Sequence, residues 1–182
     1  MDQASIETLH EGRFLRLLKD GRWEYVSRVR GIGGAAIVAV TPAREIVLVE
    51  QYRHPVQART IELPAGIVGD ESDGESPELA AERELEEETG FRPAQVERLM
   101  QGPSAPGLTS ESTYLVLATG LTRIHAGGGV AGEDIVPHVV PLDEAQDWLA
   151  GQMQAGLLIE PKVYAGLFFA ARVAADALVP PR

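Results

Sequence analysis

Residues 69–91 constrain the fold of this chain more than any other segment, and they read GDESDGESPELAAERELEEETGF. Ser76 is a favourable N-cap, Pro77 suits the first turn of a helix, and Gly90 suits the left-handed residue that follows a helix end. The segment therefore predicts a helix over residues 77–89. The 182-residue chain is long enough to build one substantial core around such a helix.

Three carboxylates gather on one face of this predicted helix. Glu84, Glu87 and Glu88 stand at positions i, i+3 and i+4, within about 100° of one another around the helix axis. Like charges at this spacing repel one another, and Arg83 is the one cation in the segment. Hard oxygen ligands in a cluster are what Mg²⁺ or Mn²⁺ binds. The pattern favours a divalent metal site, although the glutamates taken alone are also typical of a solvated acidic surface.

Charge and composition narrow the class of protein. The formal net charge is −11, and nucleic-acid backbones reward basic surfaces, so no nucleic-acid partner is expected. The chain has no cysteine, which excludes disulfides and a cysteine nucleophile and is compatible with a cytoplasmic location. Its first residues do not look like a signal peptide, and Arg172 and Asp176 interrupt the apolar run 163–179, so no membrane span is expected.

Strand and helix patterns alternate along the rest of the chain, which predicts an α/β fold. Turn residues and apolar runs predict strands and helices in the following order. Hairpins are expected to join residues 13–18 to 23–29 and 35–40 to 46–52, with strands at 60–63, 96–100, 113–118 and 135–140 and helices at 142–150 and 161–177.

Two late segments have a distinctive composition. The helix over residues 161–177 is apolar around most of its circumference, so it is either buried or faces a partner chain. Residues 125–132, HAGGGVAG, contain four glycines and form the loop expected to move most easily.

The spacing within residues 69–91 resembles the Nudix box, G-x5-E-x7-R-E-U-x-E-E-x-G-U, where U is an apolar residue. Leu85 and Phe91 fill the two apolar positions. Seven fixed residues, each with a usage of about 1 in 15, match by chance with a probability on the order of 10⁻⁸ per starting position. The fixed residues are Gly69, Glu75, Arg83, Glu84, Glu87, Glu88 and Gly90.

Markers outside the box are similar to those of one branch of this superfamily, the ADP-ribose pyrophosphatases. The markers are the run EQYRH at residues 50–54, the run IELPAG at 61–66, Pro106 about 15 residues past the box, and GEDI at 132–135 followed by HVV at 138–140. The resemblance extends from about Arg13 to the final helix, so it covers most of the chain.

The resemblance implies an α/β/α sandwich with a mixed β-sheet, plus a small N-terminal β region. It divides the chain into an N-terminal β region, residues 1–30, and a hydrolase domain, residues 31–182. In this branch the N-terminal region is exchanged between the subunits of a homodimer. The implied activity is Mg²⁺-dependent hydrolysis of a nucleoside diphosphate linked to another group, with Mn²⁺ as a substitute ion.

Carried onto this chain, the resemblance assigns roles to the box. The metal ligands are Glu84, Glu87 and Glu88 together with the carbonyl oxygen of Ala65, and Glu87 and Arg83 are counted with the catalytic residues. Arg83 is expected to fix the geometry of the helix by pairing with a box carboxylate, for which Glu75 is the candidate. Gly69 and Gly90 are structural residues of the motif.

The general base and the substrate ligands lie outside the box. Related enzymes carry a base on a loop before a late strand, which points to Glu133, because a carboxylate there can take a proton from the attacking water. Such chains often have a second acid two residues earlier, where this chain has Ala131, so Asp134 or a box carboxylate remains open as the base. The substrate-binding candidates are Arg53 for phosphate, Glu111 for the terminal ribose, Arg28 or Trp23 for the nucleoside, and Gly107 beside the marker proline.

The expected reaction is cleavage of ADP-ribose to AMP and ribose 5-phosphate. The same machinery in a related enzyme would cleave another nucleoside diphosphate sugar, such as GDP-mannose or ADP-glucose. A third alternative is a non-catalytic sensor that binds ADP-ribose, which the complete box disfavours.

Overall fold

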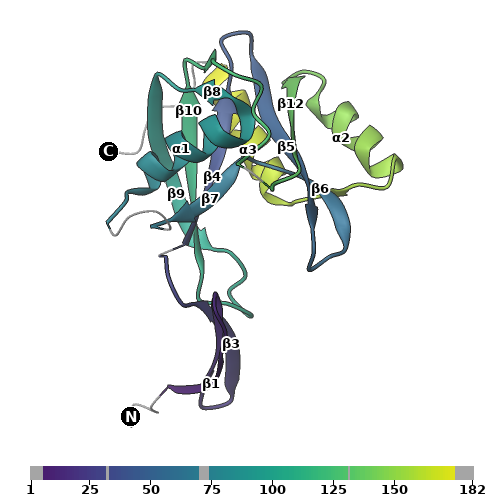
Figure 1. Ribbon diagram of the computed structural model, residues 1–182. Helices are drawn as coiled ribbons and strands as arrows, with labels where there is room; N and C mark the ends of the chain where they lie inside the picture. Colours follow the sequence, from purple (N-terminus) through teal and green to yellow (C-terminus); the bar gives the residue numbers. More distant parts are fainter. Residues whose placement is uncertain (1–5, 32, 70–73, 131, 175–182) are drawn as a thin grey trace.

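The computed structural model describes residues 6–31, 33–69, 74–130 and 132–174. Its N-terminal part is an antiparallel sheet of β1 (Glu7–Glu11), β2 (Leu15–Asp20) and β3 (Trp23–Arg28), in that order. In Figure 1 this sheet projects away from the body of the molecule. The predicted first hairpin is confirmed as β2 and β3, whereas the polar strand β1 was not predicted because it has no apolar periodicity.

The body contains one large mixed sheet whose strands run in the order β13-β6-β5-β4-β10-β9, with β12 paired to β5 and β7 paired to β4. The pairs β4·β10 and β6·β13 are parallel and the other pairs are antiparallel. The strands are β4 (Gly33–Val40), β5 (Glu45–Arg53), β6 (Ala58–Glu62), β7 (Ala65–Val68), β9 (Gln95–Pro103), β10 (Ser112–Thr119), β12 (Ile135–Pro141) and β13 (Leu158–Ile159), and a separate small sheet joins β8 (Phe91–Arg92) to β11 (Thr122–Arg123).

Helices cover both faces of the large sheet, as the alternation of side chains along β4 shows (Figure 1). Ala35, Ile37 and Ala39 pack in one buried cluster with residues of α1 (Pro77–Thr89). Ala36, Val38 and Val40 pack in a second cluster with residues of α2 (Ala145–Gln154) and α3 (Lys162–Ala174). Because successive side chains of a strand point to opposite faces, one strand supplies both cores. The predicted α/β/α sandwich is confirmed.

The strands β4 and β5 are paired over only part of their length, and the candidate site lies where they separate. They pair with each other only at Ala39 with Val47 and Val40 with Ile46. Before that point β4 pairs with β7 instead, and beyond it β5 pairs with β6. A cleft therefore opens between the two halves of the sheet, and α1 lies beside it.

Several element boundaries differ from the sequence-based predictions. β7 and β13 were missed, since they are short and gain their pairing from strands distant in the sequence. α2 begins at Ala145 and not at residue 142, because residues 142–144 form a turn after β12. On α3, Val163 is buried while Tyr164 and Phe168 are exposed, so one side of this helix packs on the core. Among the residues that the structure describes, no helix is long and apolar enough to cross a membrane.

Candidate active site

The helix α1 carries the box carboxylates and is fixed at both ends by its own sequence. The Ser76 hydroxyl accepts a hydrogen bond from the Leu79 N–H at 3.2 Å, and the Gly90 N–H donates to the Glu86 carbonyl oxygen. Gly90 has a φ of 74°, a left-handed conformation that favours glycine. The predicted helix, with its N-cap and its terminal glycine, is confirmed from residue 77 to residue 89.

Arg83 connects three carboxylates of the box. Its Nε lies 3.3 Å from a Glu75 oxygen, and its Nη1 lies 2.9 Å from Glu84 and 3.4 Å from Glu87. The second oxygen of Glu75 accepts a hydrogen bond from the Gly69 N–H at 3.0 Å. The expected pairing of Arg83 with Glu75 is present, and it ties the start of the motif to the middle of α1.

Glu88 is the most deeply buried carboxylate of the box, with 5% of its surface exposed. Burial raises the pKa of Glu88 to about 8; a hydrogen bond from the Ala65 N–H, at 3.1 Å, opposes the rise, and the neighbouring Glu84 adds to it. Burial likewise raises the pKa of Glu84, against the opposing charge of Arg83. Both carboxylates thus give up their negative charge more readily than an ordinary glutamate where α1 meets β7.

Gly66 of β7 allows this close approach of helix and strand. A Cβ atom at position 66 would overlap the carboxyl group and the Cγ of Glu84. Position 66 therefore requires glycine, because the Glu84 side chain occupies the space that a Cβ atom would fill. Ala65 and Gly66 also line the cleft, so Glu84 and Glu88, which contact these two residues, lie next to its wall.

The donor set of α1 suits a hard divalent cation, although the carboxylates do not converge on one point. Within the described residues, no three His, Cys, Asp or Glu side chains are placed to hold a metal ion together. Glu84 and Glu87 turn toward Arg83, and Glu88 turns toward the Ala65 N–H. The assignment of Glu84, Glu87 and Glu88 as metal ligands therefore stays a prediction. The chemistry still fits, because carboxylate oxygens with raised pKa gain from a nearby cation.

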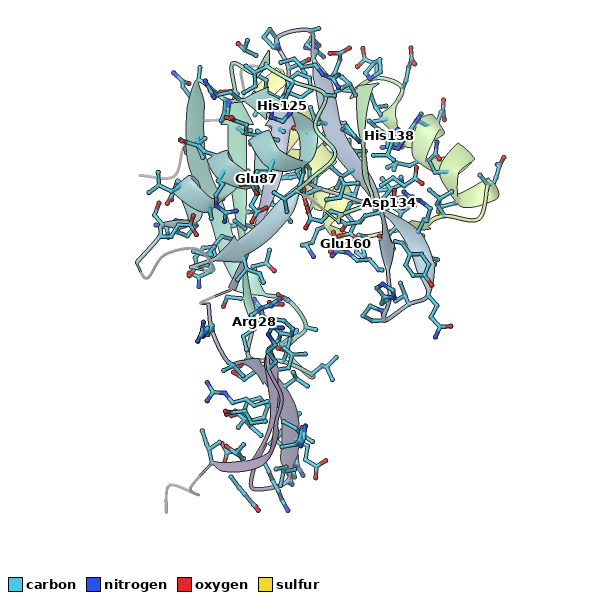
Figure 2. The ribbon with its side chains drawn as sticks, in the orientation of Figure 1. Arg28, Glu87, His125, Asp134, His138 and Glu160 are labelled. Carbon is cyan, nitrogen blue, oxygen red and sulfur yellow. The ribbon has the colours of Figure 1, made fainter. Side chains whose placement is uncertain are left out.

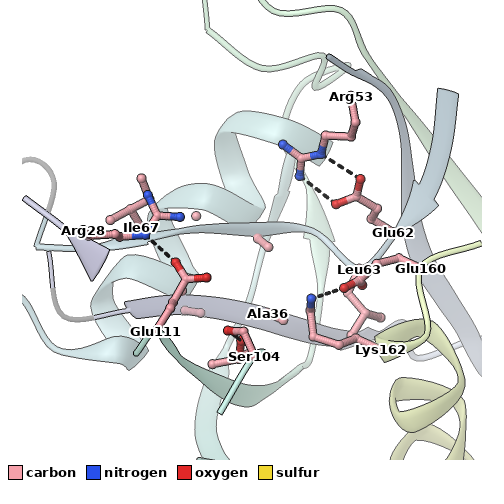
Figure 3. Close-up of a pocket in the computed structure, with 15 residues that line it drawn as sticks. Arg28, Ala36, Arg53, Glu62, Leu63, Ile67, Ser104, Glu111, Glu160 and Lys162 are labelled. Carbon is pink, nitrogen blue, oxygen red and sulfur yellow. Dashed lines mark hydrogen bonds and ion pairs between the residues drawn. The ribbon is translucent and has the colours of Figure 1, made fainter. Parts of the chain in front are cut away.

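The cleft beside α1 has a volume of about 490 Å³ and contains three ion pairs (Figure 3). Arg53 donates from two nitrogens to Glu62, at 2.7 and 2.6 Å. Arg28 pairs with Glu111, and Lys162 pairs with Glu160. Three cationic side chains thus line the cleft, although the protein is acidic as a whole. Each of them is paired with a carboxylate.

Two of these pairs include residues that the sequence reasoning missed. Glu62 is buried; burial would raise its pKa, but hydrogen bonds from Arg53 and Thr60 outweigh burial and lower it. The sequence could have indicated Glu62, because it is a carboxylate between two apolar residues, Ile61 and Leu63, in a predicted strand. Burial also lowers the pKa of Lys162, the first residue of α3. Lys162 gave no local signal, since it reaches the cleft only through the packing of α3.

Glu133 lies on a loop that is docked on the end of α1. The N–H groups of Gly128 and Gly129 donate to the carbonyl oxygens of Glu88 and Glu87, at 2.8 and 3.0 Å. The Glu133 carboxylate accepts from the Val130 N–H at 2.9 Å, and its charge raises the pKa of Glu84 and Glu88. The loop expected to move is therefore anchored at residues 128 and 129, while Ala131 lies outside the described residues.

Gly107 belongs to a second hollow and does not line the main cleft. This hollow, of about 260 Å³, lies between β3 and the loop after β9 and includes Trp23, Tyr25 and Gly107. The loop is joined to the N-terminal sheet because the Val26 N–H donates to the Leu108 carbonyl oxygen at 2.9 Å. Arg28 is the last residue of β3 and lines the cleft, and Figure 2 shows it where the N-terminal sheet meets the body of the molecule.

Known proteins share both the sequence and the fold of this chain. The family model of the NUDIX domain matches residues 32–157. A methanol dehydrogenase activator of Bacillus methanolicus is 35% identical over 79% of this chain and 80% of its own length. An ADP-ribose pyrophosphatase of Mycobacterium tuberculosis is 39% identical over 68% of this chain and 61% of its own length.

A solved structure described as an ADP compounds hydrolase superposes with a TM-score of 0.67, covering 95% of this chain and 94% of its own, at 21% identity. At that identity the superposition supports the fold alone. The family match goes further: this chain belongs to the Nudix family, and with the pyrophosphatase relatives the match shows that it is a hydrolase.

Proposed function

We propose that this hydrolase cleaves the diphosphate of ADP-ribose to AMP and ribose 5-phosphate with Mg²⁺ as its ion. The observation that carries the proposal is the cleft itself, which three cations line together with β7, the strand that packs against the acidic helix α1 (Figure 3). A diphosphate needs both kinds of group, because its oxygens are anionic and its hydrolysis needs a metal-activated water. The relative named ADP-ribose pyrophosphatase supports this choice of substrate.

The metal would be held by Glu84, Glu87, Glu88 and the carbonyl oxygen of Ala65. When bound, the ion neutralises charge on the diphosphate and lowers the pKa of a coordinated water. Arg83 contacts Glu84 and Glu87 and so orients both carboxylates. Mn²⁺ has the same preference for oxygen ligands and would replace Mg²⁺.

The substrate would be bound by the cations of the cleft. Arg53 and Lys162 lie on its wall near Ala65 and would contact phosphate oxygens, which a guanidinium can grip through two N–H groups. Arg28 and Glu111 come from the N-terminal side and would contact the nucleoside and ribose ends. The hollow that contains Gly107 and Trp23 extends the binding surface toward β3.

Glu133 would act as the general base. It stands close enough to the box for its charge to influence Glu84, Glu88 and Arg53. In the resting state its carboxylate bonds to the Val130 N–H. Release from that bond would free an oxygen to take the proton of the attacking water, a role typically worth about 10² to 10⁴ in rate.

We further propose that two copies of the chain form a homodimer through the N-terminal region, here residues 1–30, while residues 31–182 form the hydrolase domain. The projecting sheet exposes large apolar side chains: Phe14 is 66% exposed and Trp23 is 58% exposed. Large apolar side chains exposed in one small region, Phe14 between β1 and β2 and Trp23 on β3, favour contact with a partner surface. Sedimentation analysis would reveal the dimer, and a monomer at all micromolar concentrations would contradict it.

The absence of cysteine is consistent with a cytoplasmic location.

The test is product analysis on a substrate panel, with Mg²⁺ and with a chelator. ADP-ribose, ADP-glucose, GDP-mannose, NADH and diadenosine polyphosphates are incubated with the enzyme, and the released nucleotide is quantified. Chelator-sensitive release of AMP, fastest from ADP-ribose, is expected. Faster cleavage of GDP-mannose would retain the chemistry and change the substrate. Binding of ADP-ribose with no hydrolysis would contradict the enzymatic function and favour a sensor.

A further inference from the structure

A chain of four charged or polar side chains lies next to the loop that carries Glu133 and outside the cleft. The Asp134 carboxylate contacts the Arg59 Nη1 at 2.6 Å, and the Arg59 Nε contacts Glu50. The second oxygen of Glu50 lies 3.1 Å from the His138 Nε2. Figure 2 shows Asp134 and His138 on the β12 side of the molecule. None of these residues was given a role in binding metal or substrate above, and Asp134, which the sequence left open as the base, is paired with Arg59.

The strand register explains how Arg59 reaches Asp134. Tyr52 of β5 pairs with Arg59 of β6, while Gln51 of β5 pairs with Ile135 of β12. Strands β6 and β12 therefore lie on opposite edges of β5, and the guanidinium of Arg59 passes across β5 to the residue just before β12. The ion pair thus fixes the start of β12 to a strand that does not neighbour it.

This ion pair is one of two anchors on the loop. At the upstream end, the N–H groups of Gly128 and Gly129 bond to the carbonyl oxygens of the last turn of α1. At the downstream end, Asp134 bonds to Arg59. Glu133 is held between the two anchors in a tight turn, since its N–H also donates to the Val130 carbonyl oxygen at 3.1 Å.

We propose that Arg59 and Asp134 are positioning residues, which hold the start of β12 so that the Glu133 carboxylate meets the attacking water. The proposal rests on the proposed role of Glu133 as the general base. A purely stabilising role fits the pair less well, because the Asp134 side chain is 73% exposed. Exposed ion pairs contribute little to folding stability. The loss of the Asp134 carboxylate should therefore appear in turnover and not in the melting temperature, whereas Arg59→Ala also removes the partner of Glu50, whose side chain is 18% exposed.

The test compares the variants Arg59→Ala and Asp134→Ala with Arg98→Ala. Arg98 forms a looser ion pair, 3.7 Å from Glu78, on another face of the chain and serves as the matched control. Misplacing a reacting group by about 1 Å can cost up to about 10²-fold in rate, so we expect kcat to fall between about 10-fold and 100-fold with KM nearly unchanged. Asp134→Asn keeps an acceptor for Arg59 and should recover part of the loss.

The Glu133→Gln background separates the positioning role from the proposed base. If Arg59 acts through Glu133, Arg59→Ala should lower kcat in the native background and cost little in Glu133→Gln, because coupled residues are not additive. An equal loss in both backgrounds, or variants that behave like Arg98→Ala, would overturn the positioning role and leave the base intact. Unchanged kcat in Glu133→Gln would overturn the base, and the positioning role with it. Thermal melting of every variant checks that the fold is retained.

Discussion

The buried carboxylate of Glu88 predicts that the metal-free protein becomes more stable when this residue loses its charge. Burial holds the pKa of Glu88 at about 8, far above the ordinary value of 4.5 for a glutamate. In the unfolded chain the group ionises near its ordinary pKa, so its penalty is absent below pH 4.5, grows as the pH rises, and levels off above pH 8. Each pKa unit corresponds to about 1.4 kcal/mol, which gives a cost to the folded state of about 1 kcal/mol at pH 5, 3 at pH 7 and 4 at pH 8.

The variant Glu88→Gln removes this pH-dependent cost. The amide oxygen can still accept the hydrogen bond from the Ala65 N–H. The amide nitrogen gains no assured partner, which costs about 1 to 3 kcal/mol at any of these pH values. The variant should therefore be less stable than the native protein by about 1 kcal/mol at pH 5 and more stable by about 2 kcal/mol at pH 8.

Urea denaturation between pH 5 and pH 8, with a chelator present, measures this difference. Glu82→Gln is the matched control, because Glu82 is exposed on the same helix. The control should show a stability difference that is small and nearly independent of pH. A Glu88→Gln difference that stays constant with pH, or that becomes less favourable as the pH rises, would refute the reasoning. Saturating Mg²⁺ should stabilise the native protein more than Glu88→Gln, since ligands stabilise the state that binds them.

Three further variants test the site in different ways. Glu87→Gln should fold normally and lower kcat at saturating Mg²⁺ by at least about 10²-fold, and unchanged turnover would exclude Glu87 from the metal site. Gly66→Ala should displace the Glu84 carboxyl group and reduce kcat/KM by about 10²-fold with little change in melting temperature, whereas native activity would show that Glu84 can move without consequence. Lys162→Ala should raise KM for ADP-ribose by about 10-fold or more while leaving the metal dependence unchanged, because it removes a cation that lines the cleft; a native KM would exclude contact with substrate.

The structural features that could be predicted correctly from the sequence are those that depend on residues close together in the chain. The boundaries of α1 follow from Ser76, Pro77 and Gly90, whose effects act within one helical turn, and the turn between β2 and β3 follows from adjacent residues. The pairing of Arg83 with Glu75 was also predicted, because both belong to one motif. The sandwich and its mixed sheet came from the family resemblance and not from strand patterns alone.

The features that sequence missed depend on contacts between distant segments. β7 is a strand only because β4 leaves β5 and pairs with it, and no local pattern of residues 65–68 records that exchange. Lys162 reaches the cleft because α3 packs across the sheet, more than a hundred residues after Arg28. Helical spacing predicted that the box carboxylates share one face of α1, but it could not predict the protein partners to which the side chains turn, namely Arg83 and the Ala65 N–H.

Backbone hydrogen bonds at the end of α1 join the loop before β12 to the box helix. The last carbonyl groups of a helix have no partner within the helix. Here Gly90 satisfies the carbonyl of Glu86, while Gly129 and Gly128 of the loop satisfy those of Glu87 and Glu88. The backbone of two proposed metal ligands is therefore bonded directly to the loop that presents Glu133. Any shift of the loop at residues 128 and 129 must break hydrogen bonds to the turn of α1 that carries Glu87 and Glu88, so a change in the position of the loop there also changes the proposed metal site.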